Sequence, residues 1–434
     1  ASEIEVAVSG MGTLHQTGGS VTISVPQKRV DRQTEQSPTA VVDNATHAGR
    51  VTIARHVEST GLYRLSNGSL SARELLVGDA GRGAFQQTGG RAQFDSVTVG
   101  NAATGTGYVQ SDGVGFNVRP SATDVFASAV IVGQNGTGVL QLNGSAASST
   151  IDERLPDAGV PLVVRAAPGG HGVVHGWGKV SLTGPLVLNG KIIADGLGQP
   201  QSLDFTSAEA VVNTIDNAPD QSNGWYARGN AILRLPPLLV KGDGAYTFGE
   251  NDTDPVLDLV NSARLNLKGV TTEGAMLMSL VAPDRFDLPR IDDTEDDVLS
   301  AWHLDRGEVR FAAADVSFRF DHVALALRGS DASDLMLWVF NDAQWTAIDP
   351  TLLRIDADLS LLSAPIDGMF SYIALTAPGA LPTVDLPSRF KSLESVGLEP
   401  AGSVEITVVP EPGAAMLIAG LAGMLLTRRR QCPA

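Results

Sequence analysis

Acidic side chains are the residues of this sequence best suited to chemistry, because a pair of carboxylates can cleave a glycosidic bond. Such a pair stands roughly 5 to 9.5 Å apart, and one member has a raised pKa. The candidates in the first third of the chain are Glu74, Asp79, Asp95, Asp112 and Asp124. Asp79 and Asp112 stand next to glycines, where aspartate is favoured because it tolerates turn geometry. The pattern favours turns and surface ion pairs, and we predict no catalytic residue.

Metal ligation has two candidate patterns, and neither has the required spacing. His171 and His175 are separated like zinc ligands on a helix, but the glycines around them exclude a stable helix. On a strand their side chains would face the same side about 13 Å apart, too far for one ion. The acidic run 292–297 and the pair Asp331 and Asp334 match no calcium-binding repeat. We expect no metal site and no cofactor.

Composition limits both the fold and the partners. The chain has 434 residues, 47 glycines, 5% aromatic residues and a formal net charge of −17. We expect no nucleic-acid partner, because phosphate binding needs concentrated lysine and arginine. A hydrophobic content of 43%, slightly below the usual globular range, combined with glycine well above it favours many short strands and turns over helical bundles.

One pattern recurs through the first half of the chain. It consists of a Gly-x-Gly turn, alternating residues suited to a short strand, and a second glycine turn, and it starts at Gly10, Gly81, Gly105 and Gly136. Because each unit buries its apolar residues only against a similar neighbour, the repeats predict stacked coils. We therefore predict an all-β fold with a right-handed parallel β-helix (solenoid) over residues 1–290. An antiparallel sandwich with hairpins of similar length is the alternative.

Val-Gly pairs indicate the length of a coil. They stand at Val77, Val99 and Val132, separated by 22 and then 33 residues, which fits one turn and then one and a half turns. The irregular runs 27–44 and 152–170 are predicted to be loops that project from the coils. The predicted inward-facing core column consists of Leu75, Val77, Phe85, Val97, Val99, Val109, Ile131 and Leu140.

The pattern changes after residue 290. An acidic run at 291–297 precedes longer strands with fewer glycines. We predict a small β-sandwich module over residues 298–395, which resembles modules near the C-terminus of exported bacterial repeat proteins. Such a module would cap the open end of the solenoid. Residues 396–408 are predicted to be a linker.

The last part of the chain carries the most specific pattern. An extended element is predicted at Val409, Pro410, Glu411 and Pro412, because proline fixes φ and disfavours helix at the residue before it. An uncharged segment with Leu417, Ile418, Leu421, Leu425 and Leu426 follows, and it ends at Arg428, Arg429 and Arg430. About 15 residues reach about 22 Å as a helix, short of a hydrocarbon core of about 30 Å. We predict one transmembrane helix with marginal anchoring and with the arginines kept in the cytoplasm.

In this order, these residues resemble the PEP-CTERM sorting signal of bacteria that export proteins together with exopolysaccharide. The resemblance covers residues 409–434. It implies that a membrane-embedded exosortase, a cysteine transpeptidase, recognises Pro410, Glu411 and Pro412 and removes the tail at the inner membrane. An ordinary short tail anchor that is never processed is the alternative.

The combined prediction is an exported, non-enzymatic structural or adhesive protein of the bacterial cell envelope, cell surface or extracellular matrix. Exopolysaccharide or other envelope glycans are its expected partners. The one cysteine, Cys432, follows the arginines, so the exported body would contain no thiol. The start at Ala1 without a methionine predicts that a secretory signal peptide has been removed. A polysaccharide lyase or glycoside hydrolase built on a β-helix is the alternative function.

Overall fold

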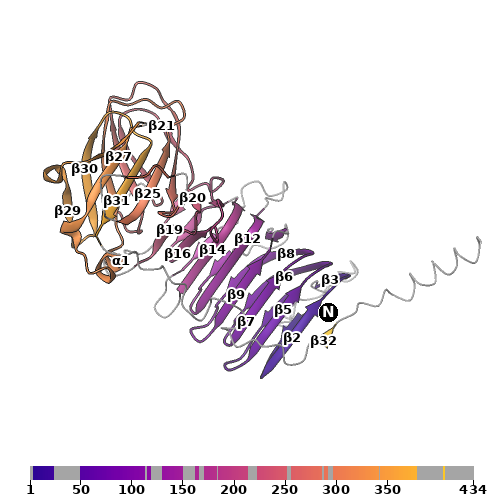
Figure 1. Ribbon diagram of the computed structural model, residues 1–434. Helices are drawn as coiled ribbons and strands as arrows, with labels where there is room; N and C mark the ends of the chain where they lie inside the picture. The colour runs from indigo at the N-terminus through magenta and orange to yellow at the C-terminus, as the bar shows by residue number, and fades with distance from the viewer. Residues whose placement is uncertain are drawn as a thin grey trace, which may run out of the picture.

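The fold is all-β, and its first half is made of parallel sheets, consistent with the predicted β-solenoid (Figure 1). The computed structural model describes residues 3–23, 49–112, 115–118, 130–149, 162–165, 171–182, 184–213, 222–251, 256–285, 288–291, 297–341, 343–378 and 404–405. The predicted loops 27–44 and 152–170 lie largely outside these ranges.

Parallel strands fill the first half of the chain. They are β1 (Glu3–Val6), β2 (Met11–Gln16), β3 (Ser20–Thr22), β4 (Arg50–Ile53), β5 (Thr60–Leu65), β6 (Ser69–Val77), β7 (Arg82–Gln87), β8 (Arg91–Val99), β9 (Thr106–Ser111), β10 (Phe116–Val118), β11 (Val130–Val132), β12 (Thr137–Ser149), β13 (Leu162–Val164), β14 (His171–Ser181), β15 (Leu186–Leu188), β16 (Lys191–Asp195), β17 (Ser202–Asp204), β18 (Val211–Val212) and β19 (Gly224–Arg228). In one sheet β2, β5, β7, β9, β12, β14, β16 and β19 follow each other in parallel pairs. We call this sheet the long sheet.

The coils have one period, and the predicted one-and-a-half-turn step is wrong. Val77 pairs with Val99, and Val99 pairs in turn with Val132, so both sequence steps advance the chain by one coil. The additional residues of the second step lie between β10 and β11. A coil can lengthen at a corner without a change of register, because strand pairing fixes only the positions inside the strands.

The interior of the solenoid holds the predicted core column with one exception. Seven of the predicted residues, from Leu75 to Leu140, belong to the main buried cluster. The prediction for Ile131 is wrong, because Val130 and Val132 on either side of it are the buried residues of β11. Side chains alternate along a strand, so the two valines point inward and Ile131 points outward.

Antiparallel strands make up the second half of the described chain. They are β20 (Ile232–Arg234), β21 (Leu238–Val240), β22 (Gly244–Phe248), β23 (Ala263–Lys268), β24 (Gly274–Val281), β25 (Asp297–Asp305), β26 (Ala313–Arg319), β27 (Met336–Phe340), β28 (Trp345–Ala347), β29 (Arg354–Asp356), β30 (Leu361–Asp367) and β31 (Tyr372–Ala377). Two short turns of 3₁₀ helix, Ala332–Asp334 and Pro350–Leu352, connect some of them. The two layers meet where Trp302 of β25 stacks on Phe318 of β26, with ring centroids 4.3 Å apart. We call this region the antiparallel module.

The change from parallel to antiparallel pairing lies at β20, which pairs with β17 on one side and with β24 on the other. Antiparallel pairing therefore starts well before residue 290. The boundaries 1–290, 298–395 and 396–408 stay predictions, because most of 379–408 lies outside the described residues.

Helix is rare in this fold. The described α-helix, α1 (His322–Leu327), has six residues, and the described part of the chain contains no helix long and apolar enough to cross a membrane. The sorting motif 409–412, the apolar segment and the arginine cluster lie outside the described residues. The last described strand, β32 (Val404–Glu405), pairs in parallel with β2 at the N-terminal end of the solenoid (Figure 1).

Candidate functional site

A row of polar side chains crosses the outer face of the long sheet. Arg64 of β5, Gln86 of β7, Gln110 of β9 and Gln141 of β12 are direct neighbours in the strand register. Phe85, which immediately precedes Gln86 in β7, lies in the interior core. Because successive side chains point to opposite faces of a sheet, the four polar residues point outward.

Hydrogen bonds join the row from coil to coil. Arg64 Nε donates to Gln86 Oε1 at 2.9 Å, and Gln86 Nε2 donates to Gln110 Oε1 at 3.3 Å. Gln110 Nε2 then donates to both carboxylate oxygens of Asp112, at 2.8 and 3.0 Å. This series of hydrogen bonds fixes the orientation of each glutamine amide. The carbonyl oxygen accepts from the preceding coil, and the NH₂ group is then directed to donate to the next acceptor.

Asp112 connects two neighbouring coils. Asn143 Nδ2 donates to Asp112 Oδ1 at 2.7 Å, and Gln141 Nε2 donates to Asn143 Oδ1 at 3.0 Å. The hydroxyl of Tyr108 donates to Gln141 Oε1. Burial and the nearby Asp112 carboxylate hold the pKa of Tyr108 above its usual range, so the phenol stays neutral and remains a donor.

We call Arg64, Gln86, Gln110, Asp112, Gln141 and Asn143 the amide row. All six side chains are half-buried, so part of each faces solvent. An amide offers two N–H donors and two acceptor positions, and the bonds along the row use only some of them. The row can therefore accept and donate further hydrogen bonds, but it holds one carboxylate and no nucleophile. The arrangement suits binding of a polar chain.

The next coils continue the line with a closed ion cluster. His175 Nε2 lies 3.0 Å from Asp195 Oδ2, and Arg228 Nε donates to the same oxygen at 2.8 Å. Burial raises the pKa of Asp195, but the hydrogen bonds from His175 and from the Leu197 backbone and the charge of Arg228 together lower it to about 2. His175 and Asp195 are 5% and 7% exposed, which closes them to a substrate. This cluster fixes the coils and is not a reaction site.

Three of the carboxylates considered in the sequence have separate hydrogen-bond partners. Glu74 bonds to Arg50, and Asp79 accepts from Asn101 Nδ2 at 2.7 Å. Asp112 has partners of its own in the amide row, so none of these three shares a partner with another. Asp95 lies within β8, and Asp124 lies outside the described residues.

No metal cluster forms in the part of the chain that the structure describes. His171 and His175 are on strand β14, as expected, with His171 exposed and His175 buried. Asp331 accepts from the backbone and side chain of Ser333 and thereby caps a 3₁₀ helix. Most of the acidic run 292–297 lies outside the described residues.

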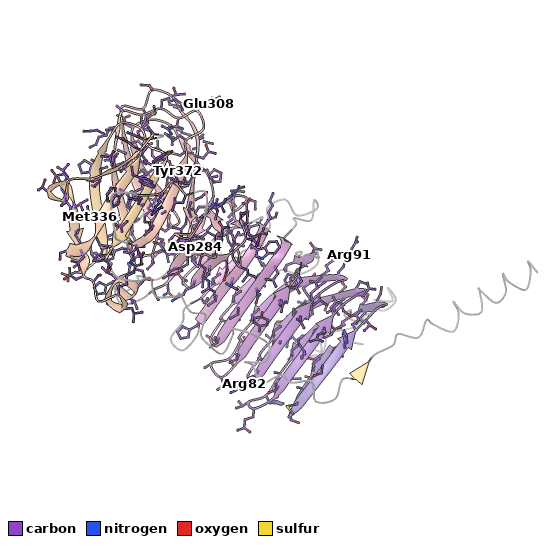
Figure 2. The ribbon with its side chains drawn as sticks, in the orientation of Figure 1. Arg82, Arg91, Asp284, Glu308, Met336 and Tyr372 are labelled. Atoms are coloured by element: carbon purple, nitrogen blue, oxygen red, sulfur yellow. The ribbon has the colours of Figure 1, made fainter. Side chains whose placement is uncertain are left out.

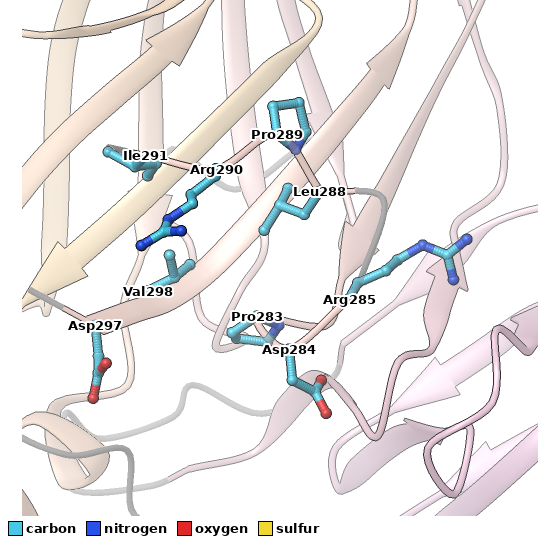
Figure 3. A pocket seen from close by; sticks show the side chains of 9 residues that line it. All are labelled: Pro283, Asp284, Arg285, Leu288, Pro289, Arg290, Ile291, Asp297 and Val298. Carbon is cyan, nitrogen blue, oxygen red and sulfur yellow. The ribbon is translucent and has the colours of Figure 1, made fainter. Parts of the chain in front are cut away.

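A pocket of about 510 Å³ lies between the end of β24 and the start of β25 (Figure 3). Its lining is Pro283, Asp284, Arg285, Leu288, Pro289, Arg290, Ile291, Asp297 and Val298. Asp284 accepts a hydrogen bond from Asn230 N at 3.1 Å, and Arg285 donates one to Asn230 O at 2.9 Å. Both side chains therefore hold the backbone of Asn230 in place. Figure 3 shows the carboxylates of Asp284 and Asp297 on separate sides of the pocket.

The sequence interpretation missed the amide row, although a signal for it exists. Glutamine follows the strand's apolar residue at the same place in three repeats, as Phe85-Gln86, Val109-Gln110 and Leu140-Gln141. Two other charged residues, Arg82 and Arg91, lie at the starts of β7 and β8 and extend from different edges of the solenoid (Figure 2). The repeat of one polar residue type at one position predicts a ladder.

Comparison with known proteins adds no relative to this description. No protein family, no curated protein and no solved structure matches the chain.

Proposed function

We propose that this chain is an exported, non-enzymatic structural or adhesive protein of a bacterial cell surface or extracellular matrix. Its solenoid is right-handed, and a β-sandwich module follows it. A PEP-CTERM tail with one transmembrane helix delivers it to an exosortase-type transpeptidase at the inner membrane. The order of Val409–Pro412, the apolar segment and Arg428–Arg430 carries this proposal.

Envelope glycan, such as exopolysaccharide, is the proposed partner of the amide row. Sugar hydroxyls donate and accept hydrogen bonds, which is what partly used amides and a carboxylate offer. The row repeats with the coil spacing of about 4.8 Å, so a long polymer can meet equivalent groups on successive coils. Many weak, equivalent contacts along a rigid surface favour adhesion over turnover.

A non-enzymatic role is supported by the distribution of carboxylates. A glycosidase needs two carboxylates about 5 to 9.5 Å apart around one bond. Glu74 forms an ion pair, Asp79 holds a corner, and Asp112 is bonded to two amides. Each therefore has a structural task that accounts for its position.

The test is the mass of the mature protein in a bacterium that carries an exosortase. We expect the intact chain to end near Pro410–Pro412 and the variant with Glu411→Ala and Pro412→Ala to keep Cys432. A matched control is available, because a second Glu-Pro pair stands at Glu399 and Pro400. The Glu399→Ala, Pro400→Ala variant should be processed like the natural chain.

Two outcomes would contradict the proposal. A natural chain that retains Cys432 while it is displayed on the surface would indicate a simple tail anchor. Equal processing of the Glu411 and Glu399 variants would show that the motif is not what the enzyme recognises.

A further inference from the structure

One row of outward side chains crosses from the solenoid into the antiparallel module. Lys179 of β14 pairs with Asp204 of β17, and Asp204 pairs with Arg234 of β20. Arg234 pairs in turn with Ser279 of β24, and Ser279 pairs with His303 of β25. The row therefore continues through the change from parallel to antiparallel pairing, so the two regions share one sheet face. We call Lys179, Asp204 and Arg234 the charged half of the row.

The row ends in four aromatic rings. His303 pairs with Tyr372 of β31, and Tyr372 pairs with Phe340 of β27. Phe340 pairs with Trp345 of β28. Figure 1 shows β25, β31 and β27 side by side in the antiparallel module. We call these four residues the aromatic half, and the strip consists of both halves and Ser279.

The strip points away from the interior of both regions. Leu233 and Trp302, which immediately precede Arg234 and His303, belong to the main buried cluster. Because successive side chains point to opposite faces of a sheet, Arg234 and His303 point outward, together with the residues paired to them. Lys179 is exposed, and all four rings are half-buried. The strip is therefore accessible along most of its length.

The four rings form a rigid cluster. The ring centroids of His303 and Tyr372 lie 4.6 Å apart, and those of Tyr372 and Phe340 lie 6.0 Å apart. Phe340 and Trp345 follow at 5.4 Å, and the indole N–H of Trp345 donates to the carbonyl of Pro289 at 2.9 Å. Neighbouring planes are inclined by 36 to 76°, so the rings lean on one another. Side chains held in this way lose little freedom when a ligand binds.

The charged half has an excess of positive charge, although the whole chain has a formal net charge of −17. Arg234 lies 3.9 Å from Asp204, and its side chain is 47% exposed. Oδ1 of Asp204 already accepts from the backbone N and the Oγ1 of Thr206, at 2.8 and 2.6 Å. An exposed ion pair of this length is weak. Arg234 and Lys179 can therefore both pair with an anionic ligand.

Cations at one end and rings at the other match the two kinds of group on an acidic sugar polymer. The C–H groups of a sugar ring pack on the negative face of an aromatic ring, and a sugar carboxylate pairs with lysine or arginine. The strip advances by one strand, about 4.8 Å, from residue to residue, which is similar to the length of one sugar unit. Single-stranded nucleic acid fits less well, because it requires a positively charged groove.

We propose that the strip from Lys179 to Trp345 binds an acidic polysaccharide that runs across the strands. Carboxylates of the polymer pair with Lys179 and Arg234, and its sugar rings pack on the aromatic half. Seven strand spacings separate the two ends of the strip, or about 34 Å. That the natural ligand is an envelope polysaccharide rests on the proposed function, whereas the binding of an acidic glycan by this face does not.

The strip and the amide row lie on different sheets. The first half of β14 pairs with β16 in the long sheet, and its second half pairs with β17 in the sheet of the strip. One molecule can therefore hold two polymer chains at once. Such a molecule cross-links a matrix in addition to adhering to it.

The test is isothermal titration calorimetry of the full chain with alginate, a polymer of uronic acids, and with dextran, a neutral polymer of glucose. We expect the natural chain to bind alginate and not dextran. Arg234→Glu should weaken alginate binding about tenfold, because it replaces an attractive charge by a repulsive one. Arg354→Glu makes the same change at an exposed position of β29, in the other sheet of the antiparallel module, and should bind normally.

The aromatic half is tested by a pair of substitutions at Phe340. Phe340→Leu keeps an apolar side chain and removes the ring, so alginate binding should weaken about fivefold. Phe340→Tyr keeps the ring and should bind like the natural chain. Added salt should weaken binding by the natural chain more than binding by Arg234→Glu, because that variant has lost one of the two ion pairs.

Four results would overturn the proposal. The natural chain could fail to bind alginate, or it could bind dextran or single-stranded DNA equally well, which would indicate a site for neutral sugars or for any polyanion. Unchanged alginate affinity in both Arg234→Glu and Phe340→Leu would place the binding on another face. Each of these results leaves the processing of the sorting tail untouched, and an unprocessed tail would leave alginate binding untouched.

Discussion

The solenoid and the antiparallel module differ in how closely other backbone segments approach some of their glycines. A Cβ added to Gly107 would stand 2.3 Å from Val77 O and 2.6 Å from Gly100 N. In the antiparallel module, a Cβ at Gly242 or Gly368 would meet nothing within 4 Å. The solenoid needs these glycines because the corner of one coil packs backbone against the strand of the next. Several glycines of the module, Gly242 and Gly368 among them, lie in open turns instead.

The antiparallel module is therefore held together mainly by side chains, whereas the solenoid also depends on close contacts of its backbone. In the antiparallel module large side chains join the layers, as Trp302 does on Phe318. In the solenoid the backbone itself must approach closely at each corner, and side chains such as Phe85 and Phe94 fill the space behind it. A small added group at a corner should consequently harm the solenoid more than the loss of a surface contact.

The largest effect is expected from Gly107→Ala. The new Cβ has backbone atoms on two sides, which cannot move without opening two coils, so we expect a loss of more than about 3 kcal/mol in the free energy of unfolding. Urea denaturation measures it. Gly18→Ala, where an added Cβ meets nothing, is the control within the same solenoid. Equal stability of the two variants would disprove the close-packed corner.

Two buried carboxylates extend the comparison to electrostatics. Asp195 in the solenoid faces His175 and Arg228 and has a pKa of about 2. Glu250, which follows β22, is buried with backbone N–H groups of Asp258 and Leu259 as donors, and burial raises its pKa to about 7 in spite of them. The first carboxylate is stabilised as an ion, whereas the second is stabilised as an acid. Their effects on stability should have opposite pH dependence.

Glu250→Gln should remove a pH dependence near neutrality. The folded pKa of Glu250 lies above its unfolded value of 4.5, so its contribution is complete below pH 4.5 and is lost as the pH rises through 7. The loss amounts to about 3 kcal/mol. The stability difference between the natural chain and the variant, measured by denaturation from pH 4 to 8, should shift by this amount in favour of the variant. A difference that does not change with pH would contradict a protonated Glu250.

Asp195→Asn should have the opposite dependence and a smaller effect. The folded pKa of Asp195 lies below its unfolded value of 3.8, so the ionised form stabilises the chain above pH 3.8 and the contribution is lost as the pH falls through 2. We expect the variant to be less stable by about 2 kcal/mol at pH 7. The gap should narrow in acid, and a constant gap from pH 7 to pH 2 would instead indicate lost packing.

Sequence patterns predict the solenoid well because its repeats are local. The Val-Gly pairs at Val77 and Val99 mark equivalent points of neighbouring coils, and seven core residues follow from alternation. Ile131 was misplaced because its two neighbours are equally apolar, and three apolar residues in a row do not reveal which face is inside. The 33-residue spacing between Val99 and Val132 was misinterpreted for a related reason. A spacing alone does not distinguish a coil with a longer corner from a coil with an additional strand.

The start of the antiparallel module and the buried charges were harder to predict. The alternating pattern of strand β20 would be the same beside a parallel or an antiparallel neighbour. The composition of the sequence therefore changes only after the strand pairing has already become antiparallel. Glu250 and Arg319 look like surface residues in the sequence, yet both are buried near Asp258. Such clusters join segments distant in the chain, and no local pattern records them.

The smallest effect concerns the amide row and distinguishes binding from structure. Gln110→Ala removes the amide that links Gln86 to Asp112, and removal of one partly exposed hydrogen-bonding group costs about 1 kcal/mol, or about fivefold in affinity for envelope exopolysaccharide. Co-sedimentation with the polysaccharide measures it. Arg82→Ala, on an exposed corner of the same strand set, is the control and should bind normally. Since a solenoid transmits a change only to adjacent coils, the antiparallel module should keep its hydrogen-exchange protection in both variants. Equal binding by the two variants would remove the amide row from the proposed function and leave the sorting tail as its support.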